Sequence, residues 1–216
     1  NHIAKHLDGL VDFIEVGSSI SFGYGSNYSM EEDLIRLNNL NNLLKSSKSV
    51  VFIQPSLLNN PIEDLKRIIE SNPSIIRLGI DPEISNSNNF EIINLLESLE
   101  VKYCLNLMKA FKYSDLQLEN IVKKIKNKKN CISINIVDSC GCMQSDEIFY
   151  ITKKISESVR TEVGVHIHNN IGQANQISCE AIDKGYFVDS TLLGKGRMGG
   201  NADTVLLVLY RALMYT

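Results

Sequence analysis

Two patterns of hydrophobic and polar positions alternate along the chain. Short runs of Val, Ile, Leu and Phe, each ended by Gly or a polar residue, predict buried strands. The segments between them place apolar residues three or four positions apart, which predicts helices that cover a sheet with one face. The seven predicted strands cover residues 12–17, 50–54, 75–79, 102–107, 131–137, 163–168 and 186–191.

A helix is predicted after each strand. Ser29 is placed to cap the first of these helices, and Glu32 occupies the capping-box position, so we expect that helix to run to about Ser46. The other predicted helices cover residues 61–71, 91–99, a segment from 114, 145–159, 174–184 and 203–214.

Strict alternation of strands and helices predicts an α/β fold with a parallel sheet and helices outside it. Two architectures fit the pattern: an open doubly wound sheet and a closed (β/α)8 TIM barrel. Seven units are one short of a barrel, and the chain starts abruptly without a methionine. We therefore expect a single TIM-barrel catalytic domain over residues 1–216, N-terminally incomplete, with its first strand missing from this chain.

Composition narrows the classes of partner. The 216 residues are 44% hydrophobic and 22% charged, with a formal net charge of −3. This is ordinary for a globular protein, and no basic face points to nucleic acid. No apolar run approaches a membrane span, and five cysteines without framework spacing favour a reducing, cytoplasmic compartment.

The strongest chemical candidate is His166-Ile-His168. Alternate residues of a strand share one face, so the two imidazoles would lie side by side, close enough to hold one metal ion. The competing interpretation is a pair of partly buried histidines that cap a strand end. Because a strand followed by a loop and a helix is the context here, we favour metal binding.

Active sites of barrels lie at the carboxyl ends of the strands. Eleven polar side chains occupy these ends: Glu15, Ser18, Gln54, Arg77, Asn106, Asp138, Ser139, His166, His168, Asp189 and Thr191. They are expected either to bind a ligand or to close the barrel mouth by hydrogen bonds. Arg77 lies within an apolar strand and needs an anion, which is either a substrate carboxylate or Glu15.

The loop after the last strand, Leu193-Gly-Lys-Gly-Arg-Met-Gly-Gly-Asn-Ala202, has four glycines, which let backbone approach a ligand closely. It lacks the Gly-Lys-Ser/Thr of a phosphate-binding P-loop. Asn201 at its end suits a third metal ligand, a helix N-cap, or both. Cys140-Gly-Cys142 is too closely spaced for a zinc knuckle and is interpreted as a tight turn.

Several motifs occur in an order typical of one enzyme family. They are Ile14-Glu-Val-Gly17, the loop 22–27, Asn106-Leu-Met108, Val137-Asp-Ser-Cys-Gly141, Gly164-Val-His-Ile-His-Asn-Asn170 and Val188-Asp-Ser-Thr-Leu-Leu-Gly-Lys-Gly-Arg-Met-Gly-Gly-Asn-Ala202. Together they resemble the DRE-TIM metallolyase superfamily, closest to its branch of 4-hydroxy-2-oxovalerate aldolase and related aldolase-like proteins. The resemblance covers nearly the whole chain.

The resemblance implies a (β/α)8 barrel with a divalent metal, Mn²⁺ or Mg²⁺, at its mouth. His166 and His168 match the metal histidines of the family, and Asn201 matches an asparagine that is a ligand in some branches. The Asp-Arg-Glu or Asp-Arg-Asp motif of the first strand, which supplies a metal carboxylate and an arginine, occurs nowhere in this sequence. The base histidine of the aldolase branch also has no match, and Asn169 stands where the family has Asp or His.

The function implied by the resemblance is cleavage or formation of a C–C bond in a 2-oxo acid, giving pyruvate enolate and an aldehyde. We assign catalytic roles to Arg77 and Ser139, and substrate binding to Gln54, Asn106, Asp138 and Thr191. The expected partners are the 2-oxo acid and aldehyde substrates, with no nucleic acid and no membrane. Barrels of this superfamily commonly dimerise, so a homodimer is also an expectation.

Two other functions remain open. An acyl-CoA lyase or a Claisen-type condensing enzyme of the same superfamily would share the metal strand, but the last loop has no cysteine of the kind those enzymes often carry. A non-catalytic barrel that acts as a binding or scaffold protein would explain why the Asp-Arg motif is missing.

Overall fold

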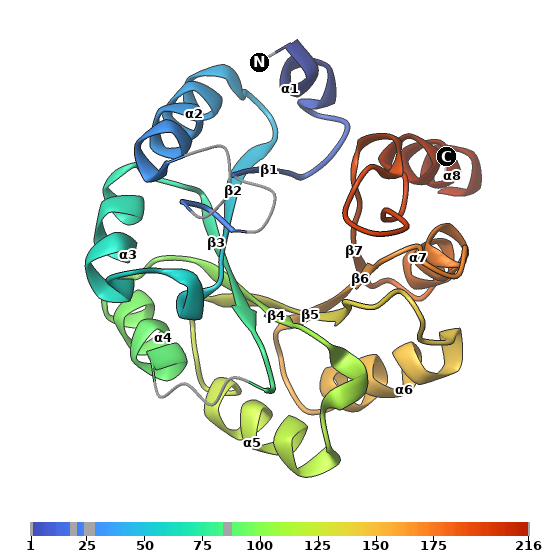
Figure 1. Cartoon of the computed structure of the whole chain (residues 1–216). Helices are drawn as coiled ribbons and strands as arrows, with labels where there is room; N and C mark the ends of the chain where they lie inside the picture. The colour runs from blue at the N-terminus through green and yellow to red at the C-terminus, as the bar shows by residue number, and fades with distance from the viewer. Residues whose placement is uncertain (1, 18–20, 24–28, 84–87, 216) are drawn as a thin grey trace. The chain divides into compact units, whose positions relative to one another are not determined.

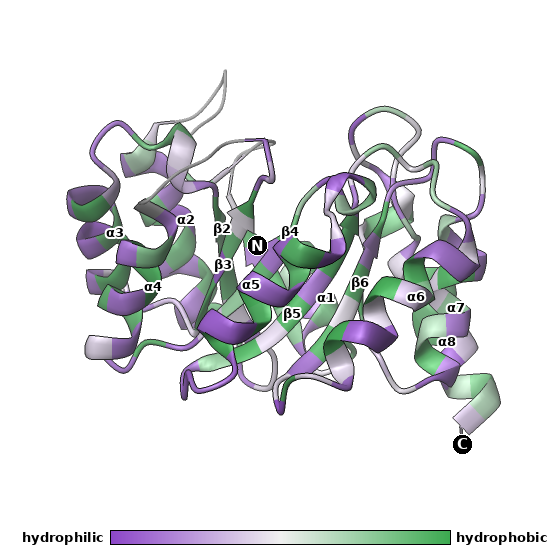
Figure 2. Cartoon of the chain, turned by 90° about the horizontal axis from the view of Figure 1, so that it is seen from below, coloured by the Kyte–Doolittle hydropathy of each residue, from purple (hydrophilic) through white to green (hydrophobic). Residues whose placement is uncertain are grey.

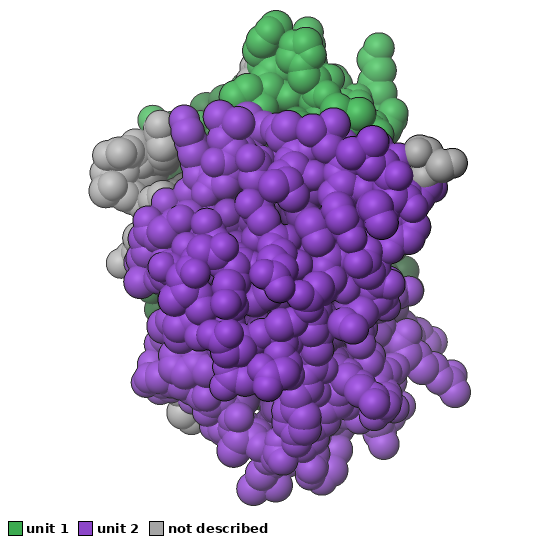
Figure 3. Space-filling view, turned by 90° about the vertical axis from the view of Figure 1, so that its right-hand side faces the viewer, with its two compact units in different colours: residues 1–80, 84–105 green, residues 81–83, 106–216 purple. Residues whose placement is uncertain are grey.

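The structure is a computed structural model that describes residues 2–17, 21–23, 29–83 and 88–215 (Figure 1). Ser18 and most of the loop 22–27 therefore lie outside the described residues. The chain divides into two compact units, coloured separately in Figure 3. Unit 1 comprises residues 1–80 and 84–105, and unit 2 comprises residues 81–83 and 106–216.

The strands of the described chain follow one another in the sheet in sequence order, from β1 to β7. The register is parallel from β1 to β3 and again from β5 to β7. A doubly wound sheet would reverse its strand order at a switch point, whereas a (β/α) barrel keeps it. The strand order therefore favours the barrel-type α/β fold, while a further strand before residue 1 stays a prediction.

Unit 1 is built from β1 to β3, the start of β4, and the helices between them. Its elements are α1 (His2–Leu7), β1 (Phe13–Val16), α2 (Met30–Leu43), β2 (Lys48–Ile53), the 3-10 turn η1 (Pro55–Leu57), α3 (Pro61–Glu70), β3 (Ile75–Ile80), α4 (Asn88–Ser98) and β4 (Tyr103–Leu107). Its core is aliphatic, with Val51, Ile53, Leu65, Ile68, Ile76, Leu78, Ile92 and Leu96 buried. In Figure 2 the ribbon of β2 and β3 is mainly green, as expected for strands covered on both faces.

Unit 2 contains the end of β4 and the remaining strands. Its further elements are η2 (Ala110–Lys112), α5 (Asp115–Ile125), β5 (Cys131–Asp138), α6 (Ser145–Ser156), β6 (Glu162–Ile167), α7 (Ala174–Asp183), β7 (Phe187–Asp189), η3 (Leu192–Gly194) and α8 (Thr204–Tyr215). Ile134, Ile136, Ile148, Ile155, Val165, Ile167 and Ile177 form its buried core. None of the helices in the described part of the chain is long and apolar enough to cross a membrane.

Every predicted strand and helix is present, and the differences lie at the ends. The capping box of α2 is formed as expected, because Glu32 N–H donates to Ser29 Oγ and Glu32 accepts from the Ser29 backbone. The prediction that this helix reaches Ser46 is wrong, since it ends at Leu43. The Asp8 carboxylate accepts the N–H groups of residues 45–47 at 2.7–2.9 Å, which holds that segment out of the helix.

Candidate metal centre

The two histidines lie at the carboxyl end of β6, in unit 2. β6 pairs with β5 on one side and β7 on the other, with His166 opposite Val137 and Asp189. The ring centroids of His166 and His168 are 5.3 Å apart, with the planes tilted by 59°. The alternation of the strand therefore brings the imidazoles together as the spacing predicts.

His166 is held by a carboxylate on the next strand. Its Nδ1 lies 3.3 Å from Asp189 Oδ2, and the side chain is 20% exposed. A carboxylate on one ring nitrogen fixes the orientation and proton position of an imidazole, and leaves the other nitrogen available as a ligand. Asp189 is thus placed to orient His166.

His168 is held by backbone on both sides. Its N–H donates to the Asp138 carbonyl at 3.4 Å, and it forms an antiparallel bridge with Asn201. Burial, followed by the charge of His166, lowers the pKa of His168 to about 4. The ring also bonds the Arg197 carbonyl, while its buried Nδ1 has no partner within the described chain. A neutral ring that donates through Nε2 presents Nδ1 as an acceptor.

Asn201 adds a second unpartnered acceptor beside this bridge. The residue is 7% exposed, its N–H donates to the Gly194 carbonyl at 2.9 Å, and Nδ2 lies 3.5 Å from the Lys195 carbonyl. Its buried Oδ1 has no partner among the residues described. A Cβ at Gly196 would overlap the Asn201 amide nitrogen, so glycine there lets the amide keep its place.

The predicted N-cap role of Asn201 is not what the structure shows. Helix α8 begins at Thr204, three residues later, and Asp203 Oδ1 accepts the Val205 N–H at 2.9 Å. The Asn201 side chain is therefore not used to start the helix. Thr191, which precedes this loop, likewise has a buried Oγ1 with no partner in the described residues.

These donors fit part of the ligand set of a divalent cation. His168 Nδ1 and Asn201 Oδ1 are unpartnered acceptors, and Asp189 leaves Nε2 of His166 to a ligand. Imidazole nitrogen and amide oxygen both bind Mn²⁺. Across residues 2–17, 21–23, 29–83 and 88–215, however, no group of three His, Cys, Asp or Glu side chains is arranged so that it could hold a metal ion. The donors form an incomplete set without a carboxylate.

The exit of β5 is shaped by Asp138. Its carboxylate is fully buried, and Oδ2 accepts the Met143 N–H at 3.0 Å. Burial raises the pKa of Asp138, against the opposing effect of nearby backbone N–H groups. This position favours a role in holding the loop 139–143, and substrate binding by Asp138 stays a prediction.

Ser139 and Asn106 lie at neighbouring strand ends in unit 2. Ser139 Oγ accepts the Lys109 N–H at 2.8 Å, and Asn106 Oδ1 accepts from Asn135 Nδ2 at 3.0 Å. Asn135 was not identified from the sequence, although an amide within an apolar strand was the available signal. Lys109 was also missed; its backbone is left-handed (φ 52°), and its Nζ lies 2.8 Å from Asp81 Oδ2 and 2.5 Å from Glu83 Oε2.

Arg77 and Gln54 belong to unit 1. Arg77 Nη1 lies 2.5 Å from Glu15 Oε2, so Glu15 is the anion that the structure supplies for this arginine. Gln54 is buried, and its N–H donates to Ser21 Oγ at 2.9 Å. The catalytic role of Arg77 and the substrate-binding role of Gln54 stay predictions.

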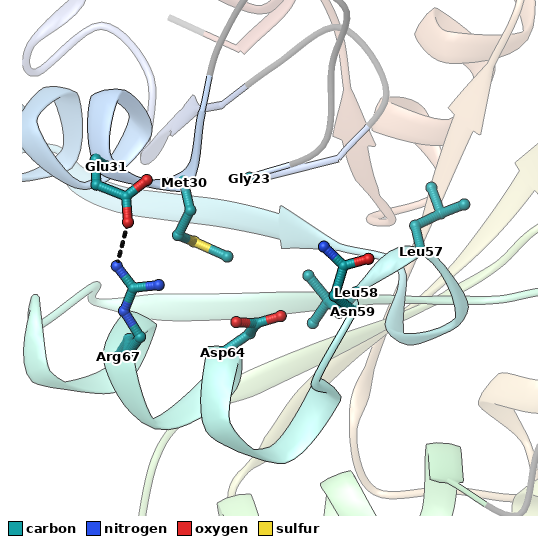
Figure 4. Close-up of a pocket in the computed structure, with 8 residues that line it drawn as sticks. All are labelled: Gly23, Met30, Glu31, Leu57, Leu58, Asn59, Asp64 and Arg67. Carbon is teal, nitrogen blue, oxygen red and sulfur yellow. Dashed lines mark hydrogen bonds and ion pairs between the residues drawn. The ribbon is translucent and has the colours of Figure 1, made fainter.

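A surface pocket of about 270 Å³ also lies in unit 1 (Figure 4). It is lined by Gly23, Met30, Glu31, Leu57, Leu58, Asn59, Asp64 and Arg67. The Arg67 guanidinium points to the Glu31 carboxylate, 2.6 Å away. None of the predicted site residues lines this pocket, and its one arginine is already paired.

Comparison with known proteins now identifies the family. The HMGL-like family matches residues 71–214, a span that includes both histidines and Asn201. The chain belongs to the HMGL-like family. This confirms the resemblance to the DRE-TIM superfamily. HMGL-like proteins are enzymes that typically depend on a divalent metal, which agrees with the partial ligand set.

Individual relatives of this HMGL-like chain are distant. It is 26% identical to the 4-hydroxy-2-oxovalerate aldolase of Moorella thermoacetica over 95% of this chain and 61% of that protein. The chain thus spans about three fifths of the length of this aldolase and of the one from Carboxydothermus hydrogenoformans.

Two solved structures show the fold. The N-terminal domain of a Bacteroides vulgatus protein superposes with a TM-score of 0.76 at 24% identity, over 98% of this chain and 71% of that one. The 3-dehydroquinate dehydratase of Aquifex aeolicus superposes with a TM-score of 0.67 at 12% identity, over 99% and 93% of the two chains. The TIM-barrel-like α/β fold of the HMGL-like chain is confirmed.

Proposed function

We propose that this chain is the barrel of a divalent-metal-dependent aldolase that cleaves a 4-hydroxy-2-oxo acid into pyruvate and an aldehyde, or joins them. The observation that carries the proposal is the pair of unpartnered acceptors, His168 Nδ1 and Asn201 Oδ1, beside His166. Membership of the HMGL-like family and the similarity to 4-hydroxy-2-oxovalerate aldolases support it.

The chain's own residues would prepare the site. His166, oriented by Asp189, and His168, neutral because its pKa is low, would hold the cation together with Asn201. When bound, a divalent cation supplies Lewis-acid polarisation of the 2-oxo group. Ser139, whose Oγ accepts the Lys109 N–H, would hydrogen-bond the substrate carboxylate.

Cleavage breaks the bond between C3 and C4 of the substrate. The 4-hydroxyl proton passes to a base, the O–H electron pair forms the aldehyde carbonyl, and the C3–C4 pair stays with pyruvate as its enolate. Protonation at C3 then completes pyruvate. We assign no residue of this chain as the base, and we expect the base, the metal carboxylate and the Asp-Arg motif from sequence before residue 1.

The test combines metal content with turnover in the full-length protein. We expect bound Mn²⁺, metal-dependent exchange of the pyruvate methyl protons with solvent deuterium, and pyruvate release from 4-hydroxy-2-oxovalerate. His166→Ala or His168→Ala should each abolish metal content and both reactions. Retention of stoichiometric Mn²⁺ by either variant would sink the assignment.

A second histidine pair supplies the matched control. His2 and His6 lie on α1 with their Nε2 atoms 3.3 Å apart, exposed to solvent. A double His2→Ala/His6→Ala variant removes this competing metal-binding pair and should keep its Mn²⁺ and its activity. A protein that binds metal but neither exchanges pyruvate nor cleaves the substrate would favour the scaffold alternative.

A further inference from the structure

Two basic side chains, those of Lys195 and Arg197, lie on the loop that carries Asn201. Lys195 and Arg197 are exposed, and each is flanked by Gly196. In the part of the chain that the structure describes, neither forms an ion pair with an acidic side chain. By contrast, all three arginines of unit 1, Arg36, Arg67 and Arg77, form ion pairs with acidic side chains.

This loop is clamped to the exit of the histidine strand. Asn169 N–H donates to the Gly200 carbonyl at 2.9 Å, and Gly199 N–H donates to Asn170 Oδ1 at 2.7 Å. Asn170 Nδ2 in turn donates to the Cys140 carbonyl at 2.7 Å. A Cβ at Gly199 would lie 2.8 Å from backbone atoms of Asn169 and Asn170, so the contact leaves no room for a side chain.

The loop backbone is also held in an unfavourable conformation. Leu193 and Met198 are left-handed, with φ of 58° and 55°, although neither is glycine. Such residues persist where their surroundings determine the backbone, and they cluster at ligand sites. The conformation fixes the segment that carries the two cations.

Arg197 lies within electrostatic range of the metal histidine. Its carbonyl bonds the His168 ring, so the clamped loop holds Arg197 next to this histidine. The side chain therefore presents an exposed guanidinium beside the proposed metal centre. A guanidinium without a carboxylate partner is suited to a two-pronged contact with a carboxylate or phosphate.

We propose that Arg197, with Lys195 beside it, recognises a second anionic group on the substrate. Resting on the proposed function, this inference narrows the substrate to dianionic 4-hydroxy-2-oxo acids, whose far end carries a carboxylate or a phosphate. The aldehyde partner in the reverse reaction is then itself an anion. Arg197 acts here as a specificity residue and takes no part in bond breaking.

The test compares aldehydes of matched length in the pyruvate-dependent aldol addition. Succinic semialdehyde and butanal have the same four-carbon chain and differ in the terminal carboxylate. Glycolaldehyde phosphate tests whether a terminal phosphate is preferred instead. A hydrogen bond to a charged group predicts a kcat/KM about 10- to 100-fold higher for the anionic aldehyde. The anionic aldehyde with the higher kcat/KM shows whether the second anionic group of the substrate is a carboxylate or a phosphate.

Arg197→Gln should bring the ratio of the two kcat/KM values close to one, and Lys195→Gln should lower it less. Arg160 is the matched control, because it is an exposed arginine that precedes β6 at the opposite end of the same strand. Arg160→Gln should leave the ratio unchanged. Equal kcat/KM for succinic semialdehyde and butanal in the unaltered protein, or a ratio that survives Arg197→Gln, overturns the inference.

Binding measurements separate this inference from the proposed function. Calorimetric titration of the Mn²⁺-loaded full-length protein needs no turnover, and 2-oxopimelate and 2-oxoheptanoate differ only in the distal carboxylate. We expect about 10-fold tighter binding of 2-oxopimelate, lost in Arg197→Gln. If the protein exchanges the pyruvate methyl protons but binds the two 2-oxo acids equally, the inference about Arg197 is refuted and the proposed function stands. If it prefers 2-oxopimelate but neither exchanges pyruvate protons nor cleaves the substrate, the proposed function is refuted.

Discussion

Replacement of Gly141 by alanine tests whether the turn after β5 supports the histidine site. Gly141 has a left-handed backbone (φ 57°), and a Cβ there would lie 2.7 Å from both the Asn170 nitrogen and the His168 carbonyl oxygen. Both atoms are backbone, which cannot swing aside as a flexible side chain would. Gly141→Ala must therefore push the exit of the histidine strand away from the turn.

The expected cost has two parts. The left-handed conformation costs alanine about 1–2 kcal/mol relative to a favourable backbone. Overpacking against backbone adds about 1–3 kcal/mol. Gly172→Ala isolates the first part, because Gly172 is also left-handed (φ 80°) but has no atom within 4 Å of the position that an alanine Cβ would take.

We therefore expect Gly141→Ala to lose about 1–3 kcal/mol more unfolding free energy than Gly172→Ala, measured by urea denaturation. For a chain of this size the difference corresponds to roughly 2–12 °C in Tm. Mn²⁺ affinity should fall in Gly141→Ala and stay unchanged in Gly172→Ala, because only the first displaces His168. Equal destabilisation and equal affinity in the two variants would refute the reasoning.

Three further predictions follow from the described contacts. Glu15→Gln removes the carboxylate from Arg77 and should cost about 1 kcal/mol or less in urea denaturation, because Glu15 is 41% exposed; a loss far above this would contradict a solvent-screened pair. The ammonium groups of Lys109 and Lys112 lower the pKa of Glu83 to about 2 from 4.5, so this contribution to stability is present above pH 4.5 and is lost as the pH falls towards 2. NMR titration of the Glu83 carboxyl checks the direction, and a midpoint at or above 4.5 would contradict it. Ser114→Ala removes the capping box of α5 and should cost about 1 kcal/mol in thermal unfolding, with no change in metal content.

Local patterns predicted most of the fold because the elements are specified by nearby residues. The capping boxes at Ser29 and Ser114 involve partners three positions away, and both form as the sequence indicates. The end of α2 was misjudged because its cause, the Asp8 carboxylate, is more than thirty-five residues away in sequence.

The candidate site shows the same contrast between features set by nearby residues and features set by residues distant in sequence. The side-by-side placement of His166 and His168 follows from strand alternation alone. The partners that orient or occupy the site residues are distant in sequence: Glu15 for Arg77, Asn135 for Asn106, and Lys109 for Ser139. Sequence periodicity does not specify such pairs. The sequence alone therefore left open whether each of these side chains binds a ligand or forms an internal hydrogen bond or ion pair.

The distribution of unpartnered buried atoms separates a ligand site from ordinary packing. In the described residues, five buried side-chain atoms lack a partner, and four of them, on Asp138, His168, Thr191 and Asn201, follow or end β5, β6 and β7. An unsatisfied buried polar atom costs about 1–3 kcal/mol, so packing faults of this kind are seldom concentrated at one end of three adjacent strands. Arg77, by contrast, has an internal partner, because its guanidinium forms an ion pair with the Glu15 carboxylate. The open atoms at the exits of β5 to β7 therefore fit a ligand site, and His168 Nδ1 and Asn201 Oδ1, together with His166, would supply part of the donor set of the divalent cation that we propose.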